Sequence, residues 1–383
     1  MFFVSSAIVV AVISLVTGPD ANTSLFLYDK FFASNKRKSQ SFGGKRIWIT
    51  GASSGIGAEL AKQLHSYGAK IILSGRREDE LKRVQSSIIL DTSENELKAN
   101  GVSLLPFDVT DTDDRIEEVV SMALGVYNGI DILILNAGSG QLGTAQDSLL
   151  STTRSLLEVN FIGPQRIALE LIRQDAWGEY TELSDYTKKK NGHIVVTSSV
   201  ASKMALPLGT SYAASKHAVH GYFSSLRSEG GEWLRVDLPC PGPIATNFQT
   251  KVIGSTSITE SSKTKKSRDD EDSSEVAMPA DRCAELILSS MMGPSSMMQE
   301  TWISRQPTLI FMYINQYFPN LSATILGKVG PLRVKAFHAG LPLYKASSWI
   351  QAAQMEKEKA KTRIGGAARK IDQNTLDASK KLK

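Results

Sequence analysis

The chain has 383 residues, 44 lysines and arginines against 39 aspartates and glutamates, and a hydrophobic fraction of 42 %. This apolar content excludes a wholly disordered or collagen-like chain, and the length allows one large domain with attachments or two to three domains. Two cysteines cannot form a disulfide framework, and the five histidines form no HExxH motif or other ligand pair, so we expect no metal site. Residues 356–383 account for the whole net charge of +5, which argues against nucleic acid as a partner.

The first nineteen residues contain no charged side chain, and residues 2–16 are nearly all apolar. As a helix this run would reach roughly 25 Å, a little less than a ~30 Å hydrocarbon core. Basic residues follow the run, and an A-x-A-like cleavage site is not evident. We therefore expect an uncleaved membrane anchor at 1–19 with its C-terminal side in the cytosol. A signal peptide and a buried helix are the alternatives. A linker at 20–44, polar from Ser34 to Gly44, is expected to follow.

From residue 45 the chain alternates short apolar runs with helix-length segments. We predict strands at 46–50, 71–74, 103–107, 130–135, 193–197 and 236–240, and a first helix carrying Ile56, Leu60 and Leu64 on one face. This alternation predicts βαβ units and a parallel sheet covered on both faces. Two polar, charged stretches, 175–191 and 255–274, are interpreted as surface insertions.

The first predicted strand ends in a glycine-rich turn. Its residues are Gly51, Ser53, Ser54, Gly55, Ile56 and Gly57, and the predicted helix starts within it. Glycines in this position allow a backbone to approach a pyrophosphate at a helix N-terminus, although a purely structural βα turn would look the same. Arg76 follows the second strand, where enzymes that use NAD usually carry an acid, so NADP(H) is favoured over NAD(H). The alternative is that this arginine only begins a solvated helix.

A second motif places Tyr212 and Lys216 four residues apart, on one helical face. A free tyrosine has a pKa of about 10, and a neighbouring ammonium would lower that pKa and make the phenol a better acid or base. Ser199 lies thirteen residues upstream, at the end of a predicted strand, where its hydroxyl could hold a substrate oxygen. Either feature alone arises often by chance.

Taken together, six ordered motifs resemble the short-chain dehydrogenase/reductase family over residues 45–304. They are TGASSGIG at 50–57, NAG at 136–138, Asn160, Ser199, Tyr212-x-x-x-Lys216 and PGP at 241–243. The resemblance implies a Rossmann-like α/β fold with three αβα layers and a seven-stranded, mostly parallel sheet that also holds the substrate site. One departure is Leu135, where the family usually has a second asparagine before NAG.

The resemblance also implies a role for individual residues. Tyr212 would be the acid/base, Ser199 would orient and polarise the substrate oxygen, Lys216 would bind the nicotinamide ribose and lower the tyrosine pKa, and Asn160 would help to hold a water. The cofactor would lie against the glycine turn, Arg76, Tyr212, Lys216 and a further set of residues: Asp108, Val109, Asn136, Ala137, Gly138, Pro241, Gly242, Ile244 and Thr246.

A finer resemblance, to anchored endoplasmic-reticulum reductases of this family, rests on the N-terminal run and on motifs around Trp302, Tyr313 and Arg333. It implies NADPH and lipophilic carbonyl substrates such as steroids or retinoids, and it is compatible with a homodimer. The alternatives are a 3-ketoacyl or 3-ketosphinganine reductase and a non-catalytic NADP-binding membrane scaffold.

Two segments complete the chain. An apolar C-terminal extension at 305–350 would lie in the membrane interface, cover the substrate site or join the core. A charged basic tail at 351–383 is expected to be solvated.

Overall fold

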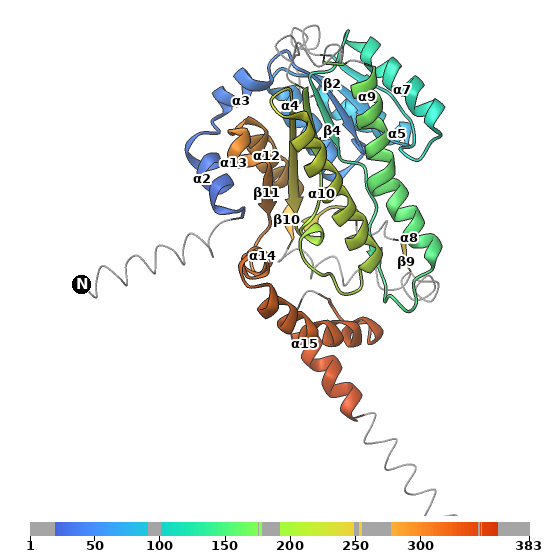
Figure 1. The fold of residues 1–383 in the computed structure, drawn as a ribbon, viewed down its shortest axis with the longest axis vertical. Helices are drawn as coiled ribbons and strands as arrows, with labels where there is room; N and C mark the ends of the chain where they lie inside the picture. Colours follow the sequence, from blue (N-terminus) through green and yellow to red (C-terminus); the bar gives the residue numbers. More distant parts are fainter. Residues whose placement is uncertain are drawn as a thin grey trace, which may run out of the picture.

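A seven-stranded, all-parallel sheet forms the centre of the molecule (Figure 1). The computed structural model describes residues 20–90, 101–174, 176–177, 192–248, 253–254, 277–343, 345 and 347–358. The strand order is β11-β7-β6-β4-β1-β2-β3, and all neighbours in this order pair in parallel. The strands are β1 (Arg46–Thr50), β2 (Lys70–Ser74), β3 (Val102–Leu104), β4 (Ile132–Leu135), β6 (Gly192–Val196), β7 (Leu234–Pro241) and β11 (Glu300–Ile303).

Helices cover both faces of the sheet. One face carries α4 (Gly55–Ser66), α5 (Glu78–Leu90) and α12 (Ala280–Met292), and the other carries α7 (Asp113–Val126), α9 (Gly163–Arg173) and α10 (Thr210–Gly230). The alternation of strand side chains explains the two layers: Ile47 and Ile49 of β1 belong to the first core, and Trp48 between them belongs to the second. The predicted Rossmann-like α/β fold is confirmed, and so is each predicted strand position to within a few residues.

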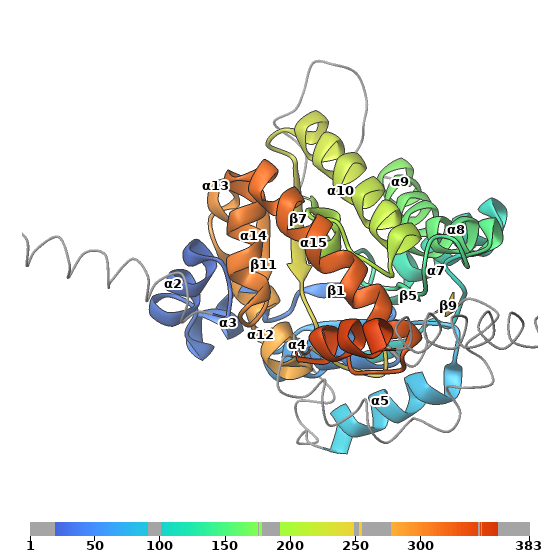
Figure 2. The same cartoon turned by 90° about the horizontal axis from the view of Figure 1, so that it is seen from below.

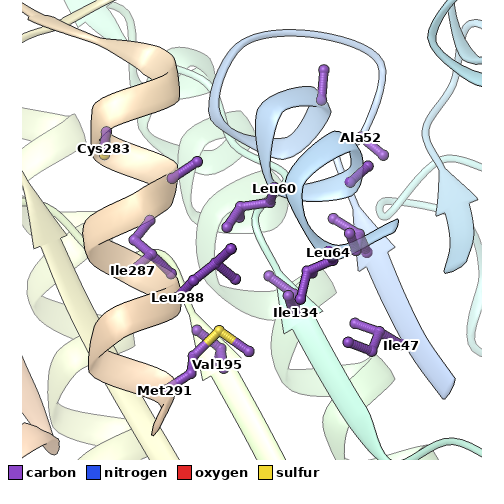
Figure 3. Packing of buried hydrophobic residues seen from close by; sticks show 14 of the residues in the cluster. Ile47, Ala52, Leu60, Leu64, Ile134, Val195, Cys283, Ile287, Leu288 and Met291 are labelled. Atoms are coloured by element: carbon purple, nitrogen blue, oxygen red, sulfur yellow. The ribbon is translucent and has the colours of Figure 1, made fainter. Parts of the chain in front are cut away.

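Packing of α4 against α12 closes the first of these cores (Figure 3). Leu60 and Leu64 of α4 and Ile287 of α12 are fully buried over strand residues such as Ile134. Each such side chain removed from water contributes about 1.5–3 kcal/mol to folding. The amphipathic spacing of the predicted first helix is therefore what holds the glycine turn, at the start of α4, over the sheet.

The segment 20–44 differs from the expected linker. It contains α2 (Thr23–Phe31) and α3 (Asn35–Phe42), which pack against α12. Ala21 forms an antiparallel bridge with Ile303, so the segment also covers the outer edge of β11. Leu25 of α2 and Phe42 of α3 are buried in the core, so one apolar side chain of each helix holds the segment on the domain.

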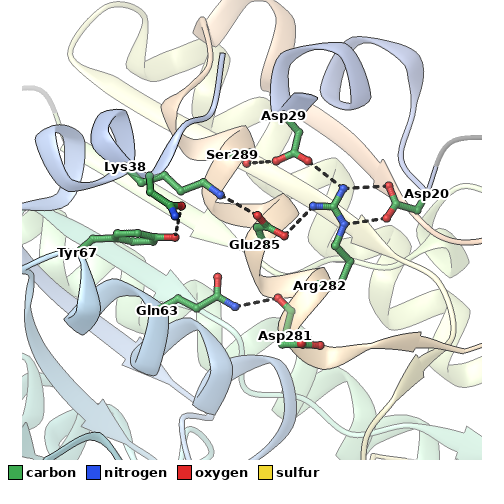
Figure 4. Close-up of polar contacts among 10 residues, drawn as sticks. Asp20, Asp29, Lys38, Gln63, Tyr67, Asp281, Arg282, Glu285 and Ser289 are labelled. Carbon is green, nitrogen blue, oxygen red and sulfur yellow. Dashed lines mark hydrogen bonds and ion pairs between the residues drawn. The ribbon is translucent and has the colours of Figure 1, made fainter. Parts of the chain in front are cut away.

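Ion pairs hold this segment on α12 (Figure 4). The Arg282 guanidinium contacts carboxylate oxygens of Asp20 at 2.8 Å and Asp29 at 2.9 Å, and it also pairs with Glu285. Glu285 in turn accepts a hydrogen bond from Lys38, whose side chain is only 1 % exposed. Burial opposes ionisation of Glu285, but the hydrogen bond from Arg282 and the charge of Lys38 lower the pKa of its carboxyl.

At the C-terminal side, α14 (Thr308–Tyr317) and α15 (Pro319–His338) lie beyond the carboxyl ends of the strands (Figures 1 and 2). A further helix covers 347–358. The Asn315 amide donates to the carbonyl oxygen of Lys203 at 2.7 Å, and α15 approaches Pro207 at Gly330. The extension thus contacts the loop between Ser199 and Tyr212. This loop lies at the edge of the sheet where the sequence predicts the active site.

Several predictions fall outside the described residues, namely the anchor at 1–19, most of the insertion at 175–191, the insertion at 255–274 and the tail beyond 358. Among the helices that the structure describes, none combines the length and the apolar content needed to cross a bilayer.

Candidate active site

The four predicted catalytic residues come from three adjacent elements at the carboxyl edge of the sheet. Ser199 follows β6 and caps the short helix η3 (Val200–Ser202), where its hydroxyl accepts from the Ala201 amide at 3.1 Å and donates to the carbonyl of Pro241 at 3.4 Å. Tyr212 and Lys216 lie in the first two turns of α10. Asn160 lies in a π-helical turn, η1 (Glu158–Ile162), a deviation that recurs at functional sites.

Lys216 is hydrogen-bonded to the residue that directly follows strand β6, two positions before Ser199. Its Nζ atom donates to the carbonyl oxygen of Thr197 at 2.8 Å, and the residue is 6 % exposed. Burial lowers the pKa of this ammonium from its ordinary value of 10.5 to about 8. A lysine with this pKa exchanges protons near neutrality, which an exposed lysine does not.

Asn160 is held rigidly by hydrogen bonds through its amide group. The oxygen accepts from the Ser139 amide at 2.8 Å, and the nitrogen donates to the Ser139 carbonyl and to the Ser215 hydroxyl, each at 2.9 Å. The Ser215 hydroxyl donates in turn to the carbonyl of Tyr212 at 2.7 Å. Asn160 is thereby connected to the helix that carries the tyrosine and the lysine. A Cβ atom on Gly138 would lie 3.1 Å from the Asn160 oxygen and 3.8 Å from Lys216 Nζ, so glycine keeps this region open.

Tyr212 lies beside an apolar neighbour from the segment after β7. Its ring makes an edge-on contact with Phe248, with the centroids 6.0 Å apart. Phe248 is 37 % exposed, so an aromatic surface borders the tyrosine on one side. The sequence did not identify Phe248, Ser215 or Thr197 as site residues. None of the three is a defining residue of the motifs that mark the family.

The glycine turn is braced by the NAG segment. The Thr50 hydroxyl accepts from the amides of Asn136 and Ala137 at 3.2 and 3.3 Å, and the Asn136 side chain donates to the carbonyl of Gly51 at 3.2 Å. Gly51 has φ +68°, and a Cβ atom there would meet the Ala137 backbone at 2.7 Å, so both its conformation and its surroundings require glycine. Leu135, the departure from the family pattern, is a buried strand residue that pairs with Thr50 and does not disturb this bracing.

The two arginines after β2 lie beside the glycine turn and the end of β3. Arg76 is 71 % exposed, and its guanidinium lies 3.6 Å from the carboxylate of Asp108. Arg77 donates to the hydroxyl of Ser53 at 3.5 Å. Val109, next to Asp108, is buried. An exposed guanidinium next to a glycine turn fits a ligand phosphate, for which it could exchange its contact with Asp108.

The segment after β7, residues 242–248, lies next to the glycine turn. Gly242 donates to the carbonyl of Ile303 at 2.8 Å, and Ile244 begins β8 (Ile244–Ala245), which pairs with β10 (Met278–Pro279). Thr246 is so close to Gly55 that a Cβ atom on that glycine would lie 3.0 Å from its methyl group. The structure therefore brings together the predicted cofactor residues from Gly51 to Thr246, along one edge of the sheet. Those residues fit a dinucleotide, because they combine the backbone amides of a glycine turn, small side chains and an exposed guanidinium. Within the described part of the chain, no group of His, Cys, Asp and Glu side chains could hold a metal ion.

Comparison with known proteins gives concordant results. The short chain dehydrogenase family profile matches residues 45–255. Human "Dehydrogenase/reductase SDR family member 7" is 34 % identical over 297 residues, covering 77 % of this chain and 80 % of that protein.

Among solved structures, a short-chain dehydrogenase/reductase from Burkholderia phymatum in complex with NAD superposes with a TM-score of 0.57 at 21 % identity, covering 73 % of this chain and 95 % of that one. An alcohol dehydrogenase from Thermococcus sibiricus complexed with 5-hydroxy-NADP superposes with a TM-score of 0.53, also at 21 % identity, covering 68 % and 97 %. At this identity both likenesses concern the fold alone.

Proposed function

This chain belongs to the short-chain dehydrogenase/reductase family, and from that membership we propose that it interconverts a ketone or aldehyde and an alcohol on a lipophilic substrate with NADP(H). Its general class is that of an NAD(P)-dependent oxidoreductase. The observation that carries the proposal is the buried Lys216, whose contact with Thr197 joins α10 to the short segment between β6 and Ser199.

When a carbonyl is reduced, residues of the chain orient the substrate oxygen and supply the proton. Ser199 turns its hydroxyl hydrogen from the Pro241 carbonyl, 3.4 Å away, to the carbonyl oxygen of the substrate, and Tyr212 transfers its phenolic proton to the same oxygen as negative charge develops. Lys216, whose lowered pKa of about 8 still leaves it mainly cationic at pH 7, stabilises the phenolate that remains. Asn160 keeps α10 in place through Ser215. The bound nicotinamide supplies the hydride.

We propose Arg76 as the group that selects NADP(H), by binding the 2′-phosphate. Its exposure and the proximity of Asp108, which can release it, support this assignment. Comparing the Kd values for NADPH and NADH, with Arg76→Ala as the variant, tests it. We expect Arg76→Ala to weaken NADPH binding about tenfold and to leave NADH binding unchanged, whereas equal affinities of the unaltered protein for both would contradict the assignment.

A lipophilic substrate is supported by the surroundings of the tyrosine. Phe248 borders Tyr212, and α14 brings Leu309 and Met312 into an apolar cluster with Val200 and Met204 of the loop that precedes the tyrosine. Steroids, retinoids and other lipid carbonyls are the class we propose. A 3-ketoacyl or 3-ketosphinganine reductase is the second candidate, and acyl thioesters and long-chain keto bases in the same assay separate the two.

We also propose attachment to the endoplasmic-reticulum membrane through residues 1–19. The Thr23 amide, just after that segment, donates a hydrogen bond to the Tyr313 hydroxyl of α14 at 2.9 Å, and the exposed Tyr317, Phe318 and Leu321 lie at the turn from α14 to α15. Aromatic and apolar side chains of this kind suit the bilayer interface. Fractionation of the full chain tests this proposal: recovery in the soluble fraction without detergent would refute it. A homodimer stays a prediction.

The function itself is tested by a cofactor-coupled screen of ketosteroids, retinal and aldehydes with the detergent-solubilised full chain. We expect NADPH oxidation with at least one of them, and loss of that activity in Tyr212→Phe. Cofactor binding without turnover across the panel would instead favour the non-catalytic membrane scaffold.

A further inference from the structure

The helix that carries the catalytic pair begins without a capping side chain of its own. At its N-cap position α10 has Gly209, which provides no side-chain hydrogen bond. Capping residues normally satisfy the free amides of the second and third helical positions, and in α10 these positions are Ser211 and Tyr212. The start of the helix, where the tyrosine lies, therefore depends on an acceptor from elsewhere.

Gln141 supplies that acceptor from seventy residues upstream. Its Oε1 atom accepts from the amide of Ser211 at 2.8 Å and from the amide of Tyr212 at 3.3 Å, and the residue is 8 % exposed. The orientation of the side-chain amide is determined by its other end. Gln141 Nε2 donates to the Ser148 hydroxyl at 2.7 Å, and that hydroxyl is an acceptor because its own hydrogen goes to the carbonyl of Thr144 at 2.6 Å.

The backbone around Gln141 connects the same helix start to a second loop. Gln141 and Leu142 form β5 (Gln141–Leu142), which pairs in parallel with β9 (Ile253–Gly254) in the segment after Phe248. Gly143 donates to the carbonyl of Leu208 at 2.9 Å, just before α10. The strand therefore joins the segment beyond Phe248, the loop before α10 and the first turn of the helix.

From these contacts we propose that Gln141 is a positioning residue. It fixes the position of Tyr212 because it caps the N-terminus of α10 from a distant segment of the same chain. The proposal rests on the proposed function. Without the cap the first turn frays, and the phenol loses its fixed position relative to Ser199 and Lys216. Because Lys216 lies one turn further into the helix and is held by Thr197, fraying moves the tyrosine relative to the lysine instead of moving both together.

The test uses the full chain in detergent and three variants. Gln141→Met keeps the size of the side chain and removes the acceptor. Gln141→Glu keeps the acceptor, and its second oxygen can accept the Ser148 hydroxyl hydrogen, which turns away from Thr144. Ser34→Ala is the matched control, because Ser34 caps α3 by accepting from the amide of Arg37, far along the chain from the site. Two readouts are taken: hydrogen exchange of the Ser211 and Tyr212 amides, and the pH dependence of kcat for alcohol oxidation.

We expect Gln141→Met to accelerate exchange of the two amides at least tenfold. We also expect it to lower kcat by about ten- to a hundredfold with unchanged cofactor Kd, and to move the rising limb of the pH profile to higher pH. Gln141→Glu should restore slow exchange and most of kcat, and Ser34→Ala should change neither readout at the site. Unchanged exchange in Gln141→Met overturns the proposal, and so does faster exchange with an unchanged kcat and pH profile. If the unaltered protein turns over no substrate, the proposed function fails, and the exchange measurement still decides whether Gln141 holds Tyr212.

Discussion

Replacing Lys216 by methionine should make the protein without cofactor more stable while it abolishes most of the activity. The lysine is buried, and its pKa falls from 10.5 to about 8 because burial disfavours the ammonium form. That difference corresponds to a cost of about 3 kcal/mol in the free energy of folding at pH 7. Methionine has a similar length and carries no charge, so it removes this cost.

The substitution Lys216→Met also removes one hydrogen bond. The hydrogen bond from Lys216 to the carbonyl of Thr197, 2.8 Å long, contributes about 1 kcal/mol, and its loss offsets part of the gain. We therefore expect Lys216→Met to raise the free energy of unfolding by about 2 kcal/mol at pH 7. Turnover should fall at least hundredfold, because the phenolate of Tyr212 loses its stabilising charge.

The stability gained through Lys216→Met should decrease as the pH rises. Because the pKa of Lys216 is lower in the folded state, the cost of its charge is fully present below about pH 8 and disappears as the pH rises to 10.5, where the unfolded lysine also loses its proton. Urea unfolding of both proteins between pH 7 and pH 10.5 measures this. A variant less stable than the unaltered protein at pH 7, or a difference that does not change over this range, would refute the reasoning.

Three further predictions concern residues outside the catalytic set. Burial raises the pKa of Cys240 to about 12 and raises that of Cys283 as well, so neither thiol should react with iodoacetamide at pH 8 before unfolding, and rapid labelling of the folded protein would contradict this. Burial opposes ionisation of Glu300, but hydrogen bonds from His220 and Trp302 lower its pKa to about 2. Glu300→Gln should therefore cost about 2 kcal/mol at pH 7 in urea unfolding, a difference that shrinks as the pH falls from 4.5 towards 2, and a constant difference would be inconsistent with this origin. Arg282→Met should destabilise the protein by about 2 kcal/mol and make α2 and α3 susceptible to limited proteolysis, whereas an unchanged digestion pattern would show that apolar packing alone holds them.

The parts of the structure that follow a local pattern were predictable. The run at 46–50 and the glycine turn after it identify a strand, a turn and a helix through residue types that the local backbone needs, such as glycine at the positive φ of Gly51. The Tyr212–Lys216 pair likewise lies on one helix face because its spacing requires it.

Features that depend on contacts between distant segments were not predictable. The helices α2 and α3 lie on the domain because Leu25 and Phe42 are buried in its core and Asp20 pairs with Arg282, which lies 262 residues later. The edge strand β11 was not among the strands predicted from hydrophobic runs, because only two of its four residues, Trp302 and Ile303, are apolar and it begins with a charged residue. No spacing rule connects Gln141 to the start of α10.

The acid/base role of Tyr212 in carbonyl reduction is the central claim, and one comparison tests it most directly. The rate of NADPH oxidation is measured with the solubilised full chain and Tyr212→Phe on the same lipophilic carbonyl, with the cofactor Kd determined for both. We predict turnover by the unaltered protein, loss of at least hundredfold in the variant, and cofactor affinities that agree within a few-fold. Turnover that survives in Tyr212→Phe would contradict the account.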